Sequence, residues 1–385
     1  MLRVVSRVSL LAAFVFVAAC SSNDKKDESS KVADLVDFER SVKHKRLWSV
    51  STGEGEGRKH LRLEPAIVND TIYVGNADGK VRAITLANGK TQWKVATDTA
   101  LSGGVGAYHG TVAFGTLDGI VVALDAETGA ERWRAQVSSE ILASPAVNNS
   151  VVVVQTIDAR VFAFDTQTGT QVWAYDHLTP VLSLRGTSGP VISSTQVVCA
   201  FDNGQVVSFS VADGSRTWEA RVSQPKGKTD LERIVDIDGS PLIEGGLVYA
   251  AGYQGNIMAF SRANGDPIWR EPVSTANALT MADDKIFVST DNARIIAFNA
   301  TNGEVAWENA ALLNRGTGAP TAVGDYIITV DADDYLHVLA QKDGSFVHRF
   351  KPAGDGFHAQ AQAHLGKLYL LSDDGKLSAY TLSSR

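Results

Sequence analysis

All seven tryptophans of the chain fall in one repeating register. They are 38 to 51 residues apart, and a glycine stands four residues before each of the last six. The tryptophans are Trp48, Trp93, Trp133, Trp173, Trp218, Trp269 and Trp307. The glycine series continues at Gly344, where His348 occupies the tryptophan position. A repeat of about forty residues is typical of propellers and solenoids, so we expect one repeat architecture and not several unrelated domains.

Each copy also contains a polar turn followed by a short apolar run, most clearly at 118–125 (DGIVVALD). These turns mark eight copies. The copies begin at Asp78, Asp118, Asp158, Asn203, Gln254, Asn292, Asp334 and Asp374. The third copy indicates four short strands separated by turn-forming residues. The expected strands are 144–147, 150–156, 160–165 and 170–173.

Runs such as 151–154 (VVVV) are apolar on both faces of a strand, which requires that both faces of the sheet be covered. Four-stranded antiparallel sheets stacked around a ring meet this need. We therefore predict an all-β, eight-bladed β-propeller over residues 45–385.

The ends of the chain indicate how this ring closes. The eighth copy ends before its own outer strand, whereas Lys45–Val50, around Trp48, is an outer-strand copy with no repeat before it. We expect these N- and C-terminal segments to share one blade. An open solenoid is the alternative, but it would leave Trp48 without a sheet to join.

The N-terminus has the pattern of a secretion signal. Arg3 and Arg7 precede the apolar run 8–17, which is too short to span a bilayer. The sequence then reads Val-Ala-Ala-Cys20, which resembles the bacterial lipobox. That resemblance implies lipidation of Cys20 and, because a serine follows, sorting to the outer membrane. The alternative is an ordinary cleavage site that happens to precede a cysteine.

Cleavage at the lipobox would remove residues 1–19 as a signal peptide. Residues 21–31 are polar, charged and free of aromatic side chains, which is typical of a flexible linker. We expect 20–44 to comprise the lipidated cysteine and this tether.

Charge and cysteine content exclude several function classes. The chain has 43 Asp and Glu against 36 Lys and Arg, and its basic residues form no block. A nucleic-acid binder needs a basic stripe to displace phosphate counterions, so this class is excluded. The 2 cysteines lie far apart, which leaves a zinc knuckle or an iron–sulfur cluster without ligands.

The repeat unit resembles a known one. A DG turn, an apolar strand, an Asp-x-x-Thr-Gly turn and a tryptophan four residues later are similar to the quinoprotein (PQQ-type) propeller repeat, over residues 46–385. Eight such copies on an outer-membrane lipoprotein resemble the BamB family of the β-barrel assembly machinery. The resemblance implies a non-catalytic scaffold on the periplasmic side of the outer membrane. Such a scaffold binds the barrel protein BamA and assists the assembly and insertion of outer-membrane proteins.

Two segments carry this family's motifs, Leu182–Gly186 (LSLRG) and Glu232–Asp238 (ERIVDID). In the family these loops contact the third POTRA domain of BamA. Carried over residue by residue, the resemblance implies five partner-binding residues. They are Leu182, Leu184, Arg185, Asp236 and Asp238.

Chain length points to the same two segments without the resemblance. They fall in consecutive tryptophan steps of 45 and 51 residues, each between an outer strand and the first strand of the next blade. Equivalent connections of a propeller lie on one face, so these two loops should be neighbours, and surplus loops on a rigid scaffold often bind partners. Leu182 and Leu184 would be apolar anchors beside Arg185, with Asp236 and Asp238 as counter-charges. Alternatively, the two leucines begin the next inner strand and pack inward.

A different mode of binding would use the blade edges. Unfolded client strands could pair with exposed edges by β-augmentation, although a closed propeller protects most of them.

The rival interpretation is a PQQ-type oxidoreductase or a periplasmic sensor. Enzymes of that family generally place a vicinal cysteine pair against the quinone and Ca²⁺ beside it. After processing only Cys199 remains here, within the apolar run 196–201, so we expect a buried and inert thiol. The carboxylates at 236–238 and 331–334 lack EF-hand spacing and are better interpreted as turn residues, and His348 as interblade packing. We therefore expect no catalytic residue, cofactor or metal.

Overall fold

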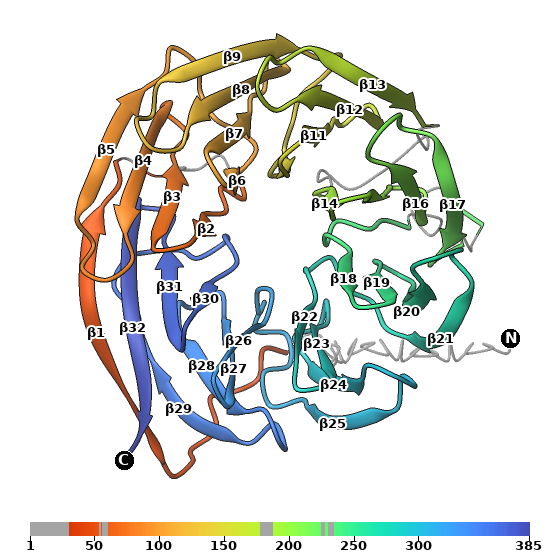
Figure 1. Ribbon diagram of the computed structural model, residues 1–385. Coiled ribbons are helices and arrows are strands. Elements are labelled where there is room, and N and C mark those ends of the chain that lie inside the picture. Colours follow the sequence, from red (N-terminus) through yellow and green to blue (C-terminus); the bar gives the residue numbers. More distant parts are fainter. Residues whose placement is uncertain (1–30, 54, 56–60, 178–187, 225–227, 230–234) are drawn as a thin grey trace, which may run out of the picture. The chain divides into compact units, whose positions relative to one another are not determined.

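The computed structural model describes residues 31–53, 55, 61–177, 188–224, 228–229 and 235–385. The account below concerns the unit Val32–Arg385. Its described residues form strands, turns and loops and contain no helix, so none that could cross a membrane. Eight four-stranded sheets stand around a ring (Figure 1). This confirms the predicted all-β, eight-bladed β-propeller.

The blades follow the chain in order, with four antiparallel strands each, given from the centre of the ring outward. Blade 1 has β2 (Ala66–Val68), β3 (Thr71–Gly75), β4 (Lys80–Thr85) and β5 (Thr91–Ala96), and blade 2 has β6 (Gly106–Tyr108), β7 (Thr111–Gly115), β8 (Ile120–Asp125) and β9 (Glu131–Gln136). Blade 3 has β10 (Ala146–Val147), β11 (Val151–Gln155), β12 (Arg160–Asp165) and β13 (Gln171–Asp176), and blade 4 has β14 (Val191–Ile192), β15 (Gln196–Ala200), β16 (Gln205–Ser210) and β17 (Arg216–Arg221). Blade 5 has β18 (Leu242–Glu244), β19 (Leu247–Ala251), β20 (Asn256–Ser261) and β21 (Pro267–Pro272), and blade 6 has β22 (Thr280–Ala282), β23 (Lys285–Ser289), β24 (Ile295–Asn299) and β25 (Val305–Asn309). Blade 7 has β26 (Thr321–Val323), β27 (Tyr326–Val330), β28 (Leu336–Ala340) and β29 (Phe346–Phe350), and blade 8 has β30 (Gln362–His364), β31 (Lys367–Leu371), β32 (Lys376–Ser384) and β1 (Val42–Ser51).

The middle strands of each blade are buried on both faces, as their unbroken apolar runs predict. In blade 3, Val152, Val153 and Val154 are each 0% exposed. The two faces contribute to different clusters, because Val153 packs toward blade 4 and Val152 and Val154 pack toward blade 2. Each interface between blades is therefore a separate apolar core, and the cores follow one another around the ring.

The repeated tryptophans fasten each blade to the next. The indole Nε1 of Trp133 donates a hydrogen bond to the Thr166 carbonyl of blade 3 at 3.0 Å, and the other six tryptophans donate to equivalent carbonyls. The indole of each tryptophan packs against the glycine in the turn of the next blade. A methyl group at Gly169, where φ is +71°, would lie 2.6 Å from the Trp133 ring. The tryptophan series is thus interblade packing.

His348 takes the tryptophan position where blade 7 meets blade 8. It is 4% exposed, and its Nε2 lies 2.7 Å from Nδ1 of His44, on the outer strand of blade 8. The His44 ring also stacks on Phe350, with ring centroids 3.7 Å apart. His348 packs between blades, as the sequence predicts.

The ring closes as predicted, with both ends of the chain in blade 8. Strand β1 pairs with β32 from Val42 opposite Ser384 to Ser51 opposite Lys376, with a bulge between Arg46 and Trp48. The first and last strands therefore complete one sheet (Figure 1).

A strap, Val32–Ser41, precedes β1 and lies against blade 7. The amide of Ala33 donates to the Leu313 carbonyl at 2.9 Å, and the amide of Ser41 donates to the Val347 carbonyl at 3.2 Å. Arg315 and Arg349 donate to the strap carbonyls of Ala33 and Val36, each at 3.0 Å.

The two arginines that bind the strap belong to a buried network that the sequence did not indicate. Asp331 accepts from Arg315 Nε at 2.7 Å and from His337 Nε2 at 2.9 Å, and Arg349 Nε donates to His337 Nδ1. Asp331 also accepts the backbone amides of Asp333 and Tyr335. The expectation that the carboxylates at 331–334 are turn residues is therefore correct but incomplete. Asp331 also positions Arg315, which donates to the strap.

Candidate partner-binding face

The connections that run from the outer strand of one blade to the inner strand of the next lie on one face of the ring, here called the loop face. The longest of them are 222–241, 177–190 and 52–65. The first two contain the motif segments that the sequence analysis nominated.

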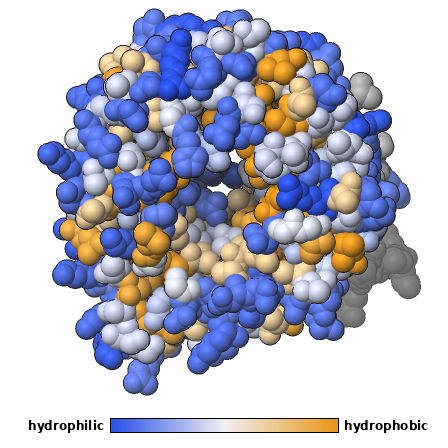
Figure 2. Space-filling view, in the orientation of Figure 1, coloured by the Kyte–Doolittle hydropathy of each residue, from blue (hydrophilic) through white to orange (hydrophobic). Residues whose placement is uncertain are grey.

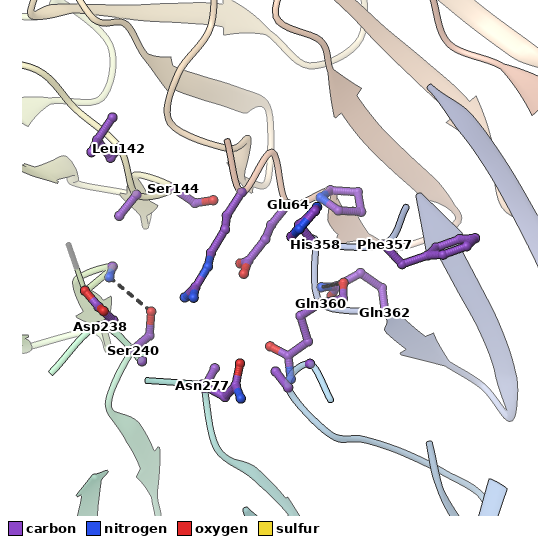
Figure 3. A pocket seen from close by; sticks show the side chains of 18 of the residues that line it. Glu64, Leu142, Ser144, Asp238, Ser240, Asn277, Phe357, His358, Gln360 and Gln362 are labelled. Atoms are coloured by element: carbon purple, nitrogen blue, oxygen red, sulfur yellow. Dashed lines mark hydrogen bonds between the residues drawn. The ribbon is translucent and has the colours of Figure 1, made fainter. Parts of the chain in front are cut away.

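The two nominated connections are neighbours, as expected. Ser188 Oγ donates to the Gly239 carbonyl at 3.3 Å, and the Gly189 amide donates to Ser240 Oγ at 3.1 Å, a bond drawn dashed in Figure 3. The bases of the two loops are therefore held together. The predicted contact residues Leu182, Leu184 and Arg185 lie outside the described residues, as does Cys20.

The structure places Asp236 in the protein interior and Asp238 at the lining of a cavity. Asp236 is 1% exposed, and its carbonyl accepts the Tyr253 amide at 2.7 Å, which ties this segment to blade 5. The Asp236 side chain thus lies inside the protein and not on its surface. Burial raises the pKa of Asp238, Arg62 opposes that shift, and Asp291 adds to it. Asp238 Oδ1 has no hydrogen-bond partner among the described residues.

A cavity of about 690 Å³ opens at the centre of the ring on the loop face. The hollow at the centre of the molecule is visible in Figure 2. Figure 3 shows that most of the labelled side chains around this cavity are polar. They include Glu64, Ser144, Asp238, Ser240, Asn277, His358, Gln360 and Gln362. Gly189 and Pro190 of the first nominated connection and 238–240 of the second line it, so the described ends of both connections reach the cavity.

Arg62 is the exposed cation of this cavity. Its Nη1 lies 3.4 Å from the Ala276 carbonyl, on the connection between blades 5 and 6. Burial raises the pKa of Glu64, and the Arg62 guanidinium limits that shift. Among the described residues, no group of three or more His, Cys, Asp and Glu side chains is arranged to hold a metal ion. The arrangement suits polar contacts with a partner chain.

Sequence reasoning overlooked the third long connection, 52–65. The step from Trp48 to Trp93 is also 45 residues, so the signal was present. Its Leu61 and Leu63 are 5% exposed each, and between them Arg62 reaches into the cavity. The loop face therefore has three long connections.

Cys199, the cysteine of the described residues, is 0% exposed, and burial raises the pKa of its thiol. It is a core residue, as predicted.

Comparisons with known proteins agree on one family. The family model described as "Outer membrane protein assembly factor BamB" matches residues 41–99, 77–309 and 278–384. The outer membrane protein assembly factor BamB of Pseudomonas aeruginosa is 44% identical over 97% of this chain and 98% of its own length. The Escherichia coli protein of the same name is 31% identical over 96% of this chain and 97% of its own length.

Solved structures share the architecture. The crystal structure of BamB from Moraxella catarrhalis has a TM-score of 0.80 and 27% identity, and the match covers 88% of this chain and 100% of that one. A europium-containing methanol dehydrogenase has a TM-score of 0.69 at 15% identity, covering 87% of this chain and 84% of that one, which is a likeness of fold alone. The chain belongs to the BamB family of outer membrane protein assembly factors.

Proposed function

We propose that this protein is a non-catalytic scaffold subunit of the outer-membrane β-barrel assembly complex. It binds the POTRA region of BamA through its loop face and assists the assembly and insertion of outer-membrane proteins. A lipid on Cys20, the residue after signal peptide 1–19, anchors it to the outer membrane, facing the periplasm. Of the expected tether 20–44, only the part before the strap Val32–Ser41 is left to act as a linker, because the strap and β1 are bound to the propeller. Tethering both proteins to one membrane raises their effective concentration, so a modest interface suffices.

The observation that carries the proposal is the adjacency of the two motif-bearing connections. Hydrogen bonds join Ser188 to Gly239 and Gly189 to Ser240 at their bases. Two loops that are far apart in the sequence can therefore form one contact surface. Membership of the BamB family supports the choice of BamA as its partner.

Within this surface each motif residue has a proposed part. Leu182 and Leu184 are apolar anchors, and Arg185 pairs with an acidic group of the partner. Asp238 offers an acceptor at the edge of the central cavity. Asp236 is buried and has an indirect role: its backbone carbonyl accepts the Tyr253 amide and so fixes the segment before Asp238 to blade 5.

The proposal of a non-catalytic role has its own support. PQQ-type dehydrogenases generally place a vicinal cysteine pair against the quinone, and the sequence contains only Cys20 and Cys199. The relatives of this chain from Pseudomonas aeruginosa and Escherichia coli, 44% and 31% identical, are named as assembly factors. Incubation with PQQ and Ca²⁺ should produce no dye reduction above that of a boiled control. Sustained turnover would contradict the scaffold proposal.

Binding to the purified POTRA region of BamA, measured by isothermal titration calorimetry, tests the loop assignment. Leu184→Asp and Arg185→Glu should each weaken binding by about tenfold or more. The first puts a charge in place of an apolar anchor, and the second puts a negative charge opposite the partner's acidic group. Gln171→Glu, on the outer strand β13, is the control and should leave affinity unchanged. If both loop variants bind as the wild type does, the contact lies elsewhere on the ring. If the wild type does not bind, the proposed partner is wrong.

A further inference from the structure

Blade 8 differs from the other blades at the face opposite the loop face. In blades 1 to 7 a tight turn joins the third strand to the outer strand there. In blade 8 both strands are chain ends, and β1 has 10 residues where other outer strands have 5 or 6. The extra length forms a two-stranded ribbon, Val42–Arg46 paired with Tyr380–Ser384. We call it the terminal ribbon; Figure 1 shows β1 and β32 running together at the outer edge of the ring toward the C-terminus.

The terminal ribbon and its flanks carry a concentration of exposed cations. They are Arg40, Lys43, Lys45, Arg46 and Arg385. None of the five forms an ion pair with another described residue, whereas arginines of other blades do, such as Arg132 with Asp125 and Arg160 with Asp176. The full chain carries a net charge of -7, so this local excess runs against the average.

The amide of Arg385 donates to the Ser41 carbonyl at 2.9 Å, which places Arg385 beside the residue that follows Arg40. The other three cations lie on β1, which begins one residue later. Burial lowers the pKa of His348, and His44, Arg40 and Arg385 lower it further. Arg40 also lowers the pKa of His44, after burial. The nearby negative charges are the terminal carboxylate and, just before the ribbon, Asp37 and Glu39. The ribbon itself has no acidic residue on either strand.

The ribbon is also well placed to meet a membrane. It forms the outermost wall of blade 8. The strap Val32–Ser41 leads from the ribbon across blade 7 to Leu313, in the connection 310–320 of the loop face, and the proposed tether begins there. The 12 residues from Cys20 to Val32 can extend at most roughly 40 Å. This reach exceeds the length of the strap that separates the start of the tether from the ribbon, so a lipid on Cys20 would leave the ribbon within reach of the bilayer.

We propose that the terminal ribbon contacts the anionic phospholipid headgroups of the membrane in which the N-terminal lipid is inserted. This rests on the proposed lipid anchoring at Cys20. A single lipid attachment combined with a basic patch is a common physical basis for stable membrane association, because each cation near an anionic surface adds to the attraction. The contact orients the propeller, with the ribbon toward the lipid and the loop face left open for BamA.

The cations of the ribbon could serve one other purpose, and the test below distinguishes it from membrane binding. Lysines on an exposed outer strand discourage the addition of strands from other molecules, and this protection requires no membrane.

The test uses the lipidated mature protein reconstituted in vesicles. A fluorophore is attached to a Lys45→Cys variant, since the thiol of Cys20 carries the lipid and Cys199 is buried. Headgroup-labelled quencher lipid is included in vesicles of phosphatidylcholine alone or of phosphatidylcholine with phosphatidylglycerol. We expect strong quenching only in the phosphatidylglycerol vesicles, with loss of quenching at high salt. A label at Gln171→Cys, on blade 3, is the matched control and should be quenched equally weakly in both.

Charge reversal completes the test. Lys43→Glu with Arg46→Glu in the Lys45→Cys background should reduce quenching to the level in neutral vesicles. Equal quenching at positions 45 and 171, or no effect of phosphatidylglycerol, would overturn the proposal and leave edge protection as the ribbon's role. Failure of Cys20 to acquire lipid would appear separately, as loss of the protein from neutral vesicles, and would overturn the anchoring proposal instead.

Discussion

At the scale of single residues, the ring is held by one interaction repeated seven times. Each tryptophan stacks on a glycine of the next blade and donates its indole N–H to a carbonyl there, as Trp133 does to Thr166 at 3.0 Å. Glycine is required for two reasons at once. The turn has a positive φ, which is +71° at Gly169, and the indole leaves no room for a side chain.

Gly169→Ala should therefore destabilise the protein, by on the order of 2 kcal/mol or more, since strain and overpacking add together. Gly246→Ala is the matched control, because no heavy atom lies within 4 Å of a methyl group there. Thermal unfolding should show a lowered melting temperature for Gly169→Ala and an almost unchanged melting temperature for Gly246→Ala. Equal melting temperatures would mean that the indole moves aside without cost.

His348 gives the eighth interface a dependence on pH. Burial, with repulsion from His44, Arg40 and Arg385, lowers its pKa to about 4 from an ordinary value of 6.5. The unfolded chain takes up a proton near the ordinary value, while the folded chain does not. The stabilisation is therefore complete above the unfolded pKa and is progressively lost as the pH falls from 6.5 toward 4.

We expect the melting temperature of the wild type to fall more steeply between about pH 7 and about pH 5 than that of His348→Phe. The other histidines are the same in both proteins, so the difference between the two profiles reports the paired His44 and His348. Parallel pH profiles would show that the His348 site is not linked to folding.

At the scale of elements, the strap is the part of the propeller that stands outside the repeat. Arg315 is 7% exposed and Asp331 is 3% exposed, so they form a buried ion pair that in turn fixes the strap carbonyl of Ala33. Removing one partner of a buried pair leaves the other charge uncompensated, which typically costs about 3–5 kcal/mol.

Arg315→Met should accordingly loosen the strap as well as destabilise blade 7. Hydrogen exchange of the Ala33 and Ser41 amides should become faster, and the melting temperature should fall. Arg294→Met is the control, because its pair with Glu308 is exposed on both sides and is expected to contribute at most about 1 kcal/mol. Unchanged exchange at both amides would mean that the strap is held without the arginine.

The elements that could be predicted from the sequence are those that repeat. Trp173 and Gly169 recur at a fixed spacing in successive copies, so the blades, their strands and the closure by Trp48 follow from periodicity. The Arg315–Asp331 network occurs once and leaves no periodic signal. The burial of Asp236 could not be predicted from the sequence either, because the pairing of its backbone with Tyr253 depends on how the two segments fold together.

At the scale of the whole molecule, the ring separates two surfaces. The loop face carries the joined connections 177–190 and 222–241 and the central cavity, while the terminal ribbon lies at the opposite face, on the outer wall of blade 8. Eight interblade cores hold these surfaces in a fixed relation. We infer that the propeller acts as a rigid adaptor, which binds its partner on one face and remains close to the membrane through its chain ends.

In-cell crosslinking tests the central claim, that the loop face binds BamA, most directly. A photo-crosslinking amino acid replaces Leu184 in the intact cell envelope, with Gln171 as the control position, and mass spectrometry identifies the adducts without assuming a partner. The account predicts that position 184 captures BamA and that position 171 does not. Capture of nothing at position 184, or of the same mixture at both positions, would contradict it and would indicate that Leu184 faces the core.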